Sequence, residues 1–191
     1  MYKLCKTEQS AARQRQLELG LLEMMQAVPY QQISITDLCD RMHIPRKAFY
    51  RYFTDREGAL YGLIDHTLME YESFSDSSPA EHRTLTGDLE TFYRFWRSQK
   101  PLLEALSRSE ISHLLIQRAI YQTVNTGAIS GRFLAADPDK IQPYVIRFAL
   151  QGMLSMVFQW HGSGFAASTS ELAVITARLL TKPLFSPGEW Y

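Results

Sequence analysis

Two short helices joined by a tight turn constrain the fold of this chain more than any other feature of its sequence. Ser34, with Asp37 three residues later, is an acidic capping arrangement that predicts the start of a helix over residues 35–42. Pro45 fits the first turn of a second helix over residues 46–52, because its missing N–H falls where no intrahelical bond is made. This spacing is typical of a helix-turn-helix unit.

Longer helices are expected on both sides of these two. Apolar side chains at three- and four-residue steps predict a helix over residues 10–27, and Pro29 ends it. Thr54 and Glu57 form a second capping box, which opens a helix that reaches Tyr71.

The remainder of the chain also carries helical patterns. A polar, serine-rich segment, residues 73–84, is typical of a connection between two parts. Further helices are expected over residues 85–99, 101–106, 110–126, 138–160 and 169–180. No stretch alternates apolar and polar residues over the length of a strand. The expected fold class is all-α, divided into residues 1–55, a connecting helix over 56–72, and residues 73–191.

Positive charge is concentrated in one short segment of a neutral chain. Lys and Arg together number 20, as do Asp and Glu, so the chain has no net field that would attract nucleic acid or a membrane. Residues 41–56 hold five basic side chains against the single acid Asp55. By itself such a run is more typical of a solvated helix face, so its meaning depends on where the charges lie.

The charges lie where a helix-turn-helix unit meets DNA. Arg46 and Lys47 fall in the first turn of the second short helix, the part that reaches base edges in the major groove. Thr36, near the start of the preceding helix, and Arg56, at the start of the following one, would flank the groove where phosphates run. This placement predicts double-stranded DNA as a partner.

The segment ISITDLCDRMHIPRKAFYRYFTDREGAL resembles the DNA-binding region of TetR-family transcriptional regulators, over about residues 11–71. The resemblance implies a three-helix helix-turn-helix DNA-binding domain, followed by a helical bundle for dimerisation and effector binding. It also implies that Arg46, Lys47 and Ala48 approach bases. Tyr50 and Arg56 would hold phosphates. The residues expected at the DNA are Ser34, Thr36, Arg46, Lys47, Ala48, Tyr50, Arg51 and Arg56.

One residue departs from the pattern of that family. His43 stands at the turn position where the family usually has glycine. A side chain in the left-handed conformation carries a steric cost, although histidine is among the residues that tolerate it best. The turn is therefore expected to form under some strain.

No other group of residues indicates catalysis or metal binding. Cys5 and Cys39 lack the spacing of a zinc site or a disulfide framework, which fits a reducing cytoplasm. His66 has Glu70 one turn on, and a pair on the helix surface is the favoured interpretation. We therefore expect no enzyme activity, cofactor or metal. No segment has the pattern of a signal peptide or a membrane span.

A long apolar helix in the C-terminal part predicts dimerisation. Residues 141–160, IQPYVIRFALQGMLSMVFQW, are apolar on nearly every face, and Arg147 and Gln151 argue against lipid. Such a helix should be buried by its own domain on one side and by a second copy of the chain on the other. TetR-like proteins pair through their last two long helices, which here would be 138–160 and 169–181. The residues expected at a homodimer interface are Ala149, Gly152, Met153, Met156, Leu172, Ile175 and Leu179.

Aromatic residues are also enriched in the C-terminal part. By the resemblance, an apolar small-molecule effector would bind among its helices, and the candidate contacts are Phe92, Trp96, Tyr121 and Phe148. Ordinary core packing accounts for each of these residues equally well. The stretch SMVFQWHGSGFAASTSELAVI resembles regulators with compact C-terminal domains, which couple to a protein partner instead.

Together these patterns predict a cytoplasmic, dimeric, sequence-specific DNA-binding regulator that represses from a palindromic operator and is controlled through its C-terminal part. The alternative is a helical protein-interaction scaffold, or a partner-controlled co-regulator without a small-molecule pocket. In that alternative the positive segment meets an acidic protein. Salt-sensitive binding to duplex DNA would separate the two.

Overall fold

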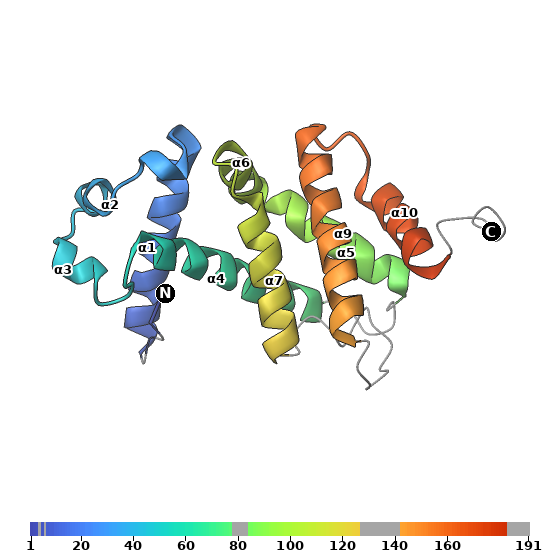
Figure 1. The fold of residues 1–191 in the computed structure, drawn as a ribbon, viewed down its shortest axis with the longest axis horizontal. Helices are drawn as coiled ribbons and strands as arrows, with labels where there is room; N and C mark the ends of the chain where they lie inside the picture. Colours follow the sequence, from blue (N-terminus) through green and yellow to red (C-terminus); the bar gives the residue numbers. More distant parts are fainter. Residues whose placement is uncertain (4, 6, 78–83, 127–141, 183–191) are drawn as a thin grey trace. The chain divides into compact units, whose positions relative to one another are not determined.

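The regular elements of the computed structural model are all helical, within the residues it describes: 1–3, 5, 7–77, 84–126 and 142–182. They are α1 (Glu8–Ala27), the 3-10 helix η1 (Tyr30–Gln32), α2 (Ile35–Arg41), α3 (Arg46–Phe49), α4 (Arg56–Asp76), α5 (Leu85–Ser98), α6 (Lys100–Arg108), α7 (Ser112–Thr126), α9 (Gln142–Gly162) and α10 (Thr169–Thr181) (Figure 1). Outside the helices, Tyr2 and Phe53 form an isolated antiparallel bridge. The expected all-α fold class is confirmed.

The chain folds into two compact units that interleave along the sequence. Unit 1 comprises Met1–Glu70 and Lys100–Ala119, and unit 2 comprises Tyr71–Gln99 and Ile120–Tyr191. The expected parts, by contrast, follow one another along the chain. The assignment of DNA binding to residues 1–55 remains a prediction, but the compact unit that contains those residues also includes α6.

In unit 1, α6 covers one side of α1. Leu21 and Met25 of α1 are fully buried, as are Leu103 and Leu106 of α6. Hydrogen bonds reinforce this apolar contact, because the Gln26 side chain donates to the carbonyl of Pro101 at 2.8 Å and the Tyr30 N–H donates to Ser109 Oγ at 2.9 Å. The end of α1 is thereby held to a segment about 80 residues further along the chain.

Reciprocal capping boxes form before α2 and before α10. Ser34 Oγ accepts the Asp37 N–H at 3.1 Å and Asp37 accepts the Ser34 N–H at 2.8 Å, so α2 begins where predicted. Ser168 and Glu171 make the same reciprocal pair before α10. The box predicted at Thr54 and Glu57 is wrong. Asp55 caps α4 instead, through the Gly58 N–H at 2.6 Å, and the Thr54 hydroxyl donates to the carbonyl of Met1.

Helix α3 is shorter than predicted and ends at Phe49 rather than at residue 52. The Lys3 ammonium donates to the Tyr50 carbonyl and the Lys3 N–H donates to the Tyr52 carbonyl, both at 2.8 Å. These carbonyls therefore pair with the N-terminal segment, and the chain leaves α3 as a turn.

The core of unit 2 is aromatic. Tyr93 of α5 and Trp160 of α9 are buried, with ring centroids 5.8 Å apart in an edge-to-face arrangement. The Tyr93 hydroxyl bonds Thr176 of α10 at 2.6 Å, which joins α5 to the last helix. The end predicted for the helix over 138–160 is two residues early, because α9 continues to Gly162. The start predicted for that helix lies outside the described residues.

None of the described helices combines the length and the apolar character needed to cross a membrane.

Candidate nucleic-acid interface

The turn between α2 and α3 is closed by a residue in the left-handed conformation. His43 has φ of +51°, as its place in the sequence predicts. The His43 N–H donates to the Asp40 carbonyl at 3.1 Å and the Ile44 N–H donates to the Cys39 carbonyl at 3.0 Å. These two bonds are the Schellman pattern that ends a helix and reverses the chain, so α3 is set at a fixed angle to α2.

A small apolar core holds both short helices on α1. Leu38, Phe49 and Phe53 are buried, and the rings of Phe49 and Phe53 lie 5.1 Å apart. Gly20 of α1 contributes by its lack of a side chain, since a Cβ there would come within 2.4 Å of the Met42 sulfur. Close approach at Gly20 therefore seats α2 directly against α1.

The first turn of α3 presents its two cations to solvent. Arg46 and Lys47 are exposed, whereas the neighbouring Ala48 is half-buried. A nitrogen of the Arg46 guanidinium lies 3.4 Å from the Tyr50 hydroxyl, which is also exposed. The structure thus brings together three of the residues predicted at DNA on one exposed surface, and Arg51 follows them, also exposed.

Around this surface, the remaining predicted residues differ in how freely they could meet DNA. Thr36 is exposed at the start of α2. The Ser34 hydroxyl is engaged in the capping box, and the hydrogen bonds from Ser34 hold the pKa of the Asp37 carboxyl below its usual range. Ser34 therefore fixes the start of α2, as a cap should.

Arg56 is turned toward the protein. Its guanidinium donates to the carbonyl of Gln31 at 3.2 Å and to that of Ile33, and it stacks over the Tyr30 ring at 4.3 Å. These contacts tie the start of α4 to the loop before α2. The phosphate contact predicted for Arg56 is not favoured by this placement, which gives the side chain a positioning role.

A polar network around the buried Glu18 joins α1 to α4, and sequence reasoning missed it. Glu18 of α1 is fully buried, 2.7 Å from His66 Nδ1 and 3.3 Å from Arg15. Arg15 also pairs with Glu70 at 2.6 Å. The predicted surface pair of His66 with Glu70 is therefore wrong, because each residue has a partner on α1. Glu18 directly follows Leu17, one of the apolar side chains that predict the helix over residues 10–27. An acid beside the buried face of a helix was the signal from which a buried ion pair could have been predicted.

The predicted dimer residues lie on α9 and α10, but only some of them face solvent. Ala149, Met153 and Leu172 are buried within unit 2. Ile175 and Leu179 of α10 are 47% and 41% exposed. Gly152 is also exposed, and a Cβ built on it would meet no atom within 4 Å.

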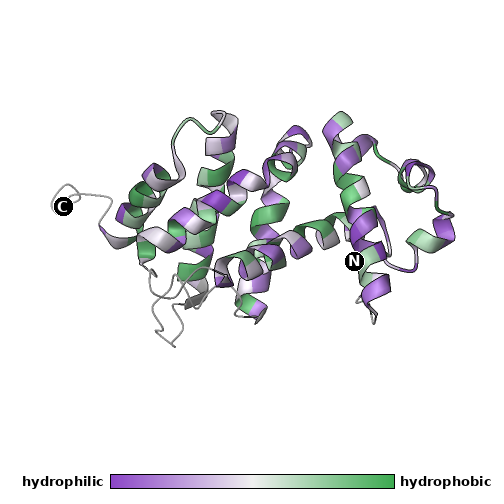
Figure 2. Cartoon of the chain, turned by 180° about the vertical axis from the view of Figure 1, so that it is seen from behind, coloured by the Kyte–Doolittle hydropathy of each residue, from purple (hydrophilic) through white to green (hydrophobic). Residues whose placement is uncertain are grey.

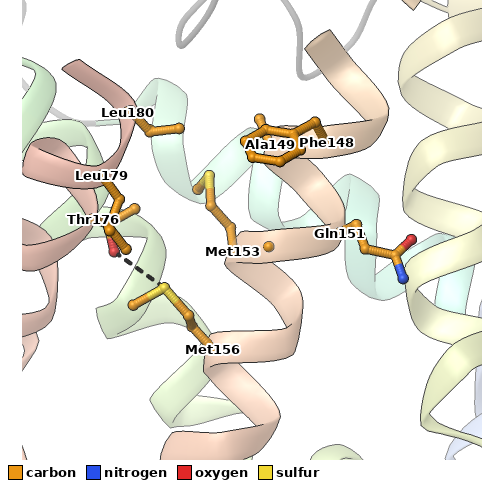
Figure 3. Close-up of a pocket in the computed structure, with 9 residues that line it drawn as sticks. Phe148, Ala149, Gln151, Met153, Met156, Thr176, Leu179 and Leu180 are labelled. Carbon is orange, nitrogen blue, oxygen red and sulfur yellow. Dashed lines mark hydrogen bonds between the residues drawn. The ribbon is translucent and has the colours of Figure 1, made fainter. Parts of the chain in front are cut away.

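An apolar hollow of about 280 Å³ lies between α9 and α10 (Figure 3). Met156 lines it and is half-buried, and its sulfur accepts the Thr176 hydroxyl at 3.8 Å. Phe148 at its rim is 71% exposed. Figure 2 shows that hydrophobic residues run along both helices.

The four predicted effector residues lie in different surroundings. Phe92 and Trp96 are buried in α5, with ring centroids 6.2 Å apart, and the Trp96 indole N–H has no hydrogen-bond partner among the described residues. Tyr121 is exposed on α7, and Phe148 borders the hollow between α9 and α10. Effector binding by these residues remains a prediction.

Comparison with known proteins finds similarity in structure and not in sequence. No protein-family model matches this chain, and no curated protein matches it. The dihydroxyacetone kinase operon activator DhaS aligns over 87% of this chain and 93% of its own, with a TM-score of 0.54 and 17% identity. The fatty acid degradation regulator FadR from Bacillus halodurans aligns over 95% and 98%, with a TM-score of 0.59 and 12% identity.

A TetR-family repressor, AlkX from Dietzia sp. strain DQ12-45-1b, aligns more loosely, with a TM-score of 0.47 and 13% identity over 87% of this chain and 94% of its own. At such identities the similarity concerns the fold. The chain has an all-α fold, and the solved structures that share it include an operon activator and a regulator of fatty acid degradation.

Proposed function

We propose that this chain is a sequence-specific DNA-binding transcriptional regulator of the TetR type. The observation that carries the proposal is the exposed first turn of α3, where Arg46 and Lys47 project from a helix whose opposite face is anchored by Phe49. A guanidinium or ammonium in this position reaches the O6 and N7 acceptors of guanine when the helix enters the major groove. The fold it shares with solved transcriptional regulators supports the same function.

The fixed geometry of α2, α3 and the start of α4 supports sequence-specific binding over a general attraction to phosphate. The Schellman turn at His43 and the cap at Ser34 fix both ends of α2, and Arg56 fixes the start of α4. Side chains held in one geometry distinguish base edges, whereas flexible cations neutralise phosphates without regard to sequence.

The regulator acts as a homodimer, and the apolar surface of α9 and α10 supports this part of the proposal. Phe148, Ile175 and Leu179 are large, exposed and apolar, and contiguous apolar surface of this kind marks an association site. A Cβ built on Gly152 would meet no atom within 4 Å, so a second helix could approach this surface closely there. A two-fold dimer would address two half-sites about 34–36 Å apart, or a multiple of that spacing.

Repression is the action we propose, because a dimer seated on an operator obstructs transcription there without any further surface. Control through the C-terminal part remains part of the proposal. The hollow between α9 and α10 is apolar and open, and it would accept either a small apolar molecule or a side chain from a protein partner.

Selection of bound fragments from a random duplex library tests the proposed function. The wild-type chain should enrich an imperfect palindrome, while a variant that combines Arg46→Ala with Lys47→Ala should enrich none. A matched control is Arg97→Gln, which removes an exposed arginine of α5 in unit 2. If the wild-type chain enriches no sequence and binds polyglutamate as well as duplex, the protein-interaction scaffold replaces the regulator.

A further inference from the structure

A polar hollow of about 290 Å³ lies beside the end of α3, on unit 1. It is lined by Gln9, Ser10 and Arg13 from the start of α1, and by Arg51 and Tyr52 from the turn that follows α3. Figure 1 shows the start of α1 on the same side of unit 1 as α3. All five lining side chains carry hydrogen-bond donors, and none is acidic.

The two arginines face this hollow without a negative partner in the described part of the chain. One nitrogen of the Arg13 guanidinium donates a hydrogen bond to the amide oxygen of Gln16 at 2.8 Å. Its other N–H groups remain available to a ligand. Arg51 is exposed. Neither residue forms an ion pair with any described acid, unlike Arg15 and Arg41, which pair with glutamates. Two like charges around one hollow repel each other until an anion enters it.

The N-terminal segment holds this arrangement in place. Lys3 bonds the carbonyls of Tyr50 and Tyr52 on either side of Arg51, so the backbone that carries Arg51 is fixed. The Thr7 side chain caps α1 by accepting the Ser10 N–H at 3.2 Å, which fixes the opposite wall. The donors are therefore organised before any ligand arrives.

We propose that this hollow binds one phosphate of the DNA backbone, outside the bases that α3 reads. Guanidinium groups donate several parallel N–H bonds to one tetrahedral oxyanion, and a hydroxyl and an amide complete the set. A backbone phosphate is favoured over a free anion because Arg51 follows Tyr50 directly in the chain, so the hollow continues the surface that presents Arg46 and Lys47. The proposal rests on the proposed function, and it adds a contact that fixes register on the duplex.

The test measures how duplex affinity depends on salt, using a 30-base-pair duplex of mixed sequence and fluorescence anisotropy. The variants are Arg13→Gln, Arg51→Gln, the double variant, and the control Arg97→Gln. Because one phosphate contact contributes about 0.9 to the slope of log K against log salt, the double variant should lose about 0.9. Each single variant should fall between the wild type and the double variant, the control should match the wild type, and Arg51→Lys should keep most of the slope.

Thermal unfolding verifies that the variants fold, as expected for exposed side chains. A double variant that keeps the wild-type slope while Arg46→Ala weakens binding overturns the phosphate site and leaves the proposed function intact. A loss of about 1.8 assigns the arginines to two phosphates and overturns the shared site. If no variant or wild-type chain binds duplex in a salt-dependent way, the proposed function fails and the site fails with it.

Titration with inorganic phosphate, followed by NMR at the arginine side-chain N–H groups, addresses the other source of the same chemistry. Perturbation of Arg13 and Arg51 only at tens of millimolar phosphate is expected for a site built for a polymer. Submillimolar binding combined with an unchanged duplex slope would show a free-anion site instead.

Discussion

At the scale of single residues, the cationic side chains of unit 1 differ in whether they have ion-pair or hydrogen-bond partners within the fold. Arg41 pairs with Glu23 across α1 and α2, and Arg56 is bound to backbone carbonyls. Arg46 makes one long contact, to Tyr50, and Lys47 is exposed beside it. Positive charge along the sequence is similar at each of these positions, so the distinction comes from the fold.

We expect Arg46→Ala or Lys47→Ala to weaken binding to the selected operator by about 1–3 kcal/mol, the usual value of a bidentate contact to a base. Binding to a random duplex should change less, because bases are not read there. Arg41→Ala is the matched control, since it removes a positive charge from the neighbouring helix. Equal losses on operator and random duplex would assign Arg46 and Lys47 to phosphates.

The left-handed turn predicts a stabilising substitution. His43→Gly removes the steric cost of a side chain at φ of +51°, and the unfolding free energy should rise by about 1 kcal/mol. The midpoint of thermal unfolding should rise by about 2–4 °C for a chain of this size. His43→Val should lower both quantities, because a branched side chain tolerates this conformation poorly. A lower midpoint for His43→Gly would show that the imidazole makes a compensating contact.

At the scale of helices, an end could be predicted from the sequence where it depends on nearby residues, and could not where it depends on residues far along the chain. The caps at Ser34 and Ser168 were predictable, because a capping box depends on residues three apart. The cap of α4 and the end of α3 were not, because Met1 and Lys3, some 50 residues away, bond Thr54 and Tyr50. The role of Arg56 was missed for the same reason, since its aromatic partner is Tyr30.

The two capping boxes predict acid sensitivity of the helices that they start. Hydrogen bonds from the backbone and hydroxyl of Ser34 and of Ser168 hold the pKa values of Asp37 and Glu171 below their usual range. A carboxyl with a lowered pKa in the folded state stabilises the fold above its unfolded pKa, and that stability is lost as pH falls through the folded value. The free energy of unfolding should therefore decline below about pH 5.

Urea unfolding at a series of pH values checks this expectation. Asp37→Asn and Glu171→Gln should each be less stable than the wild type at pH 7 and should converge with it in acid. A wild-type curve parallel to both variants down to pH 3 would mean that the boxes contribute nothing through charge.

At the scale of the whole molecule, the exposed apolar surface of α9 and α10 predicts how the chain associates. Gly152→Arg should convert the proposed dimer to a monomer, because an unpaired charge buried at an interface costs several kcal/mol. The substitution has open space within its own subunit, so the fold should survive. Sedimentation velocity measures the association and circular dichroism measures the fold.

Gly162→Arg is the matched control, since it also lies in open space but at the end of α9. It should remain dimeric. A wild-type chain that sediments as a monomer while binding the operator tightly would contradict the dimer.

The packing of α6 onto α1 also has an evolutionary consequence. Residues 1–70 form one compact unit with residues 100–119, through contacts such as Gln26 with Pro101 and Tyr30 with Ser109. Joining residues 1–70 to a sequence without an equivalent of α6 would leave one side of α1 uncovered. Exchange of residues 1–70 alone would therefore separate them from the α6 segment with which they form one compact unit. Under the proposed function, substitution at exposed positions such as Arg46 and Lys47 would change the DNA sequence that is bound while leaving the packing of α6 on α1 intact.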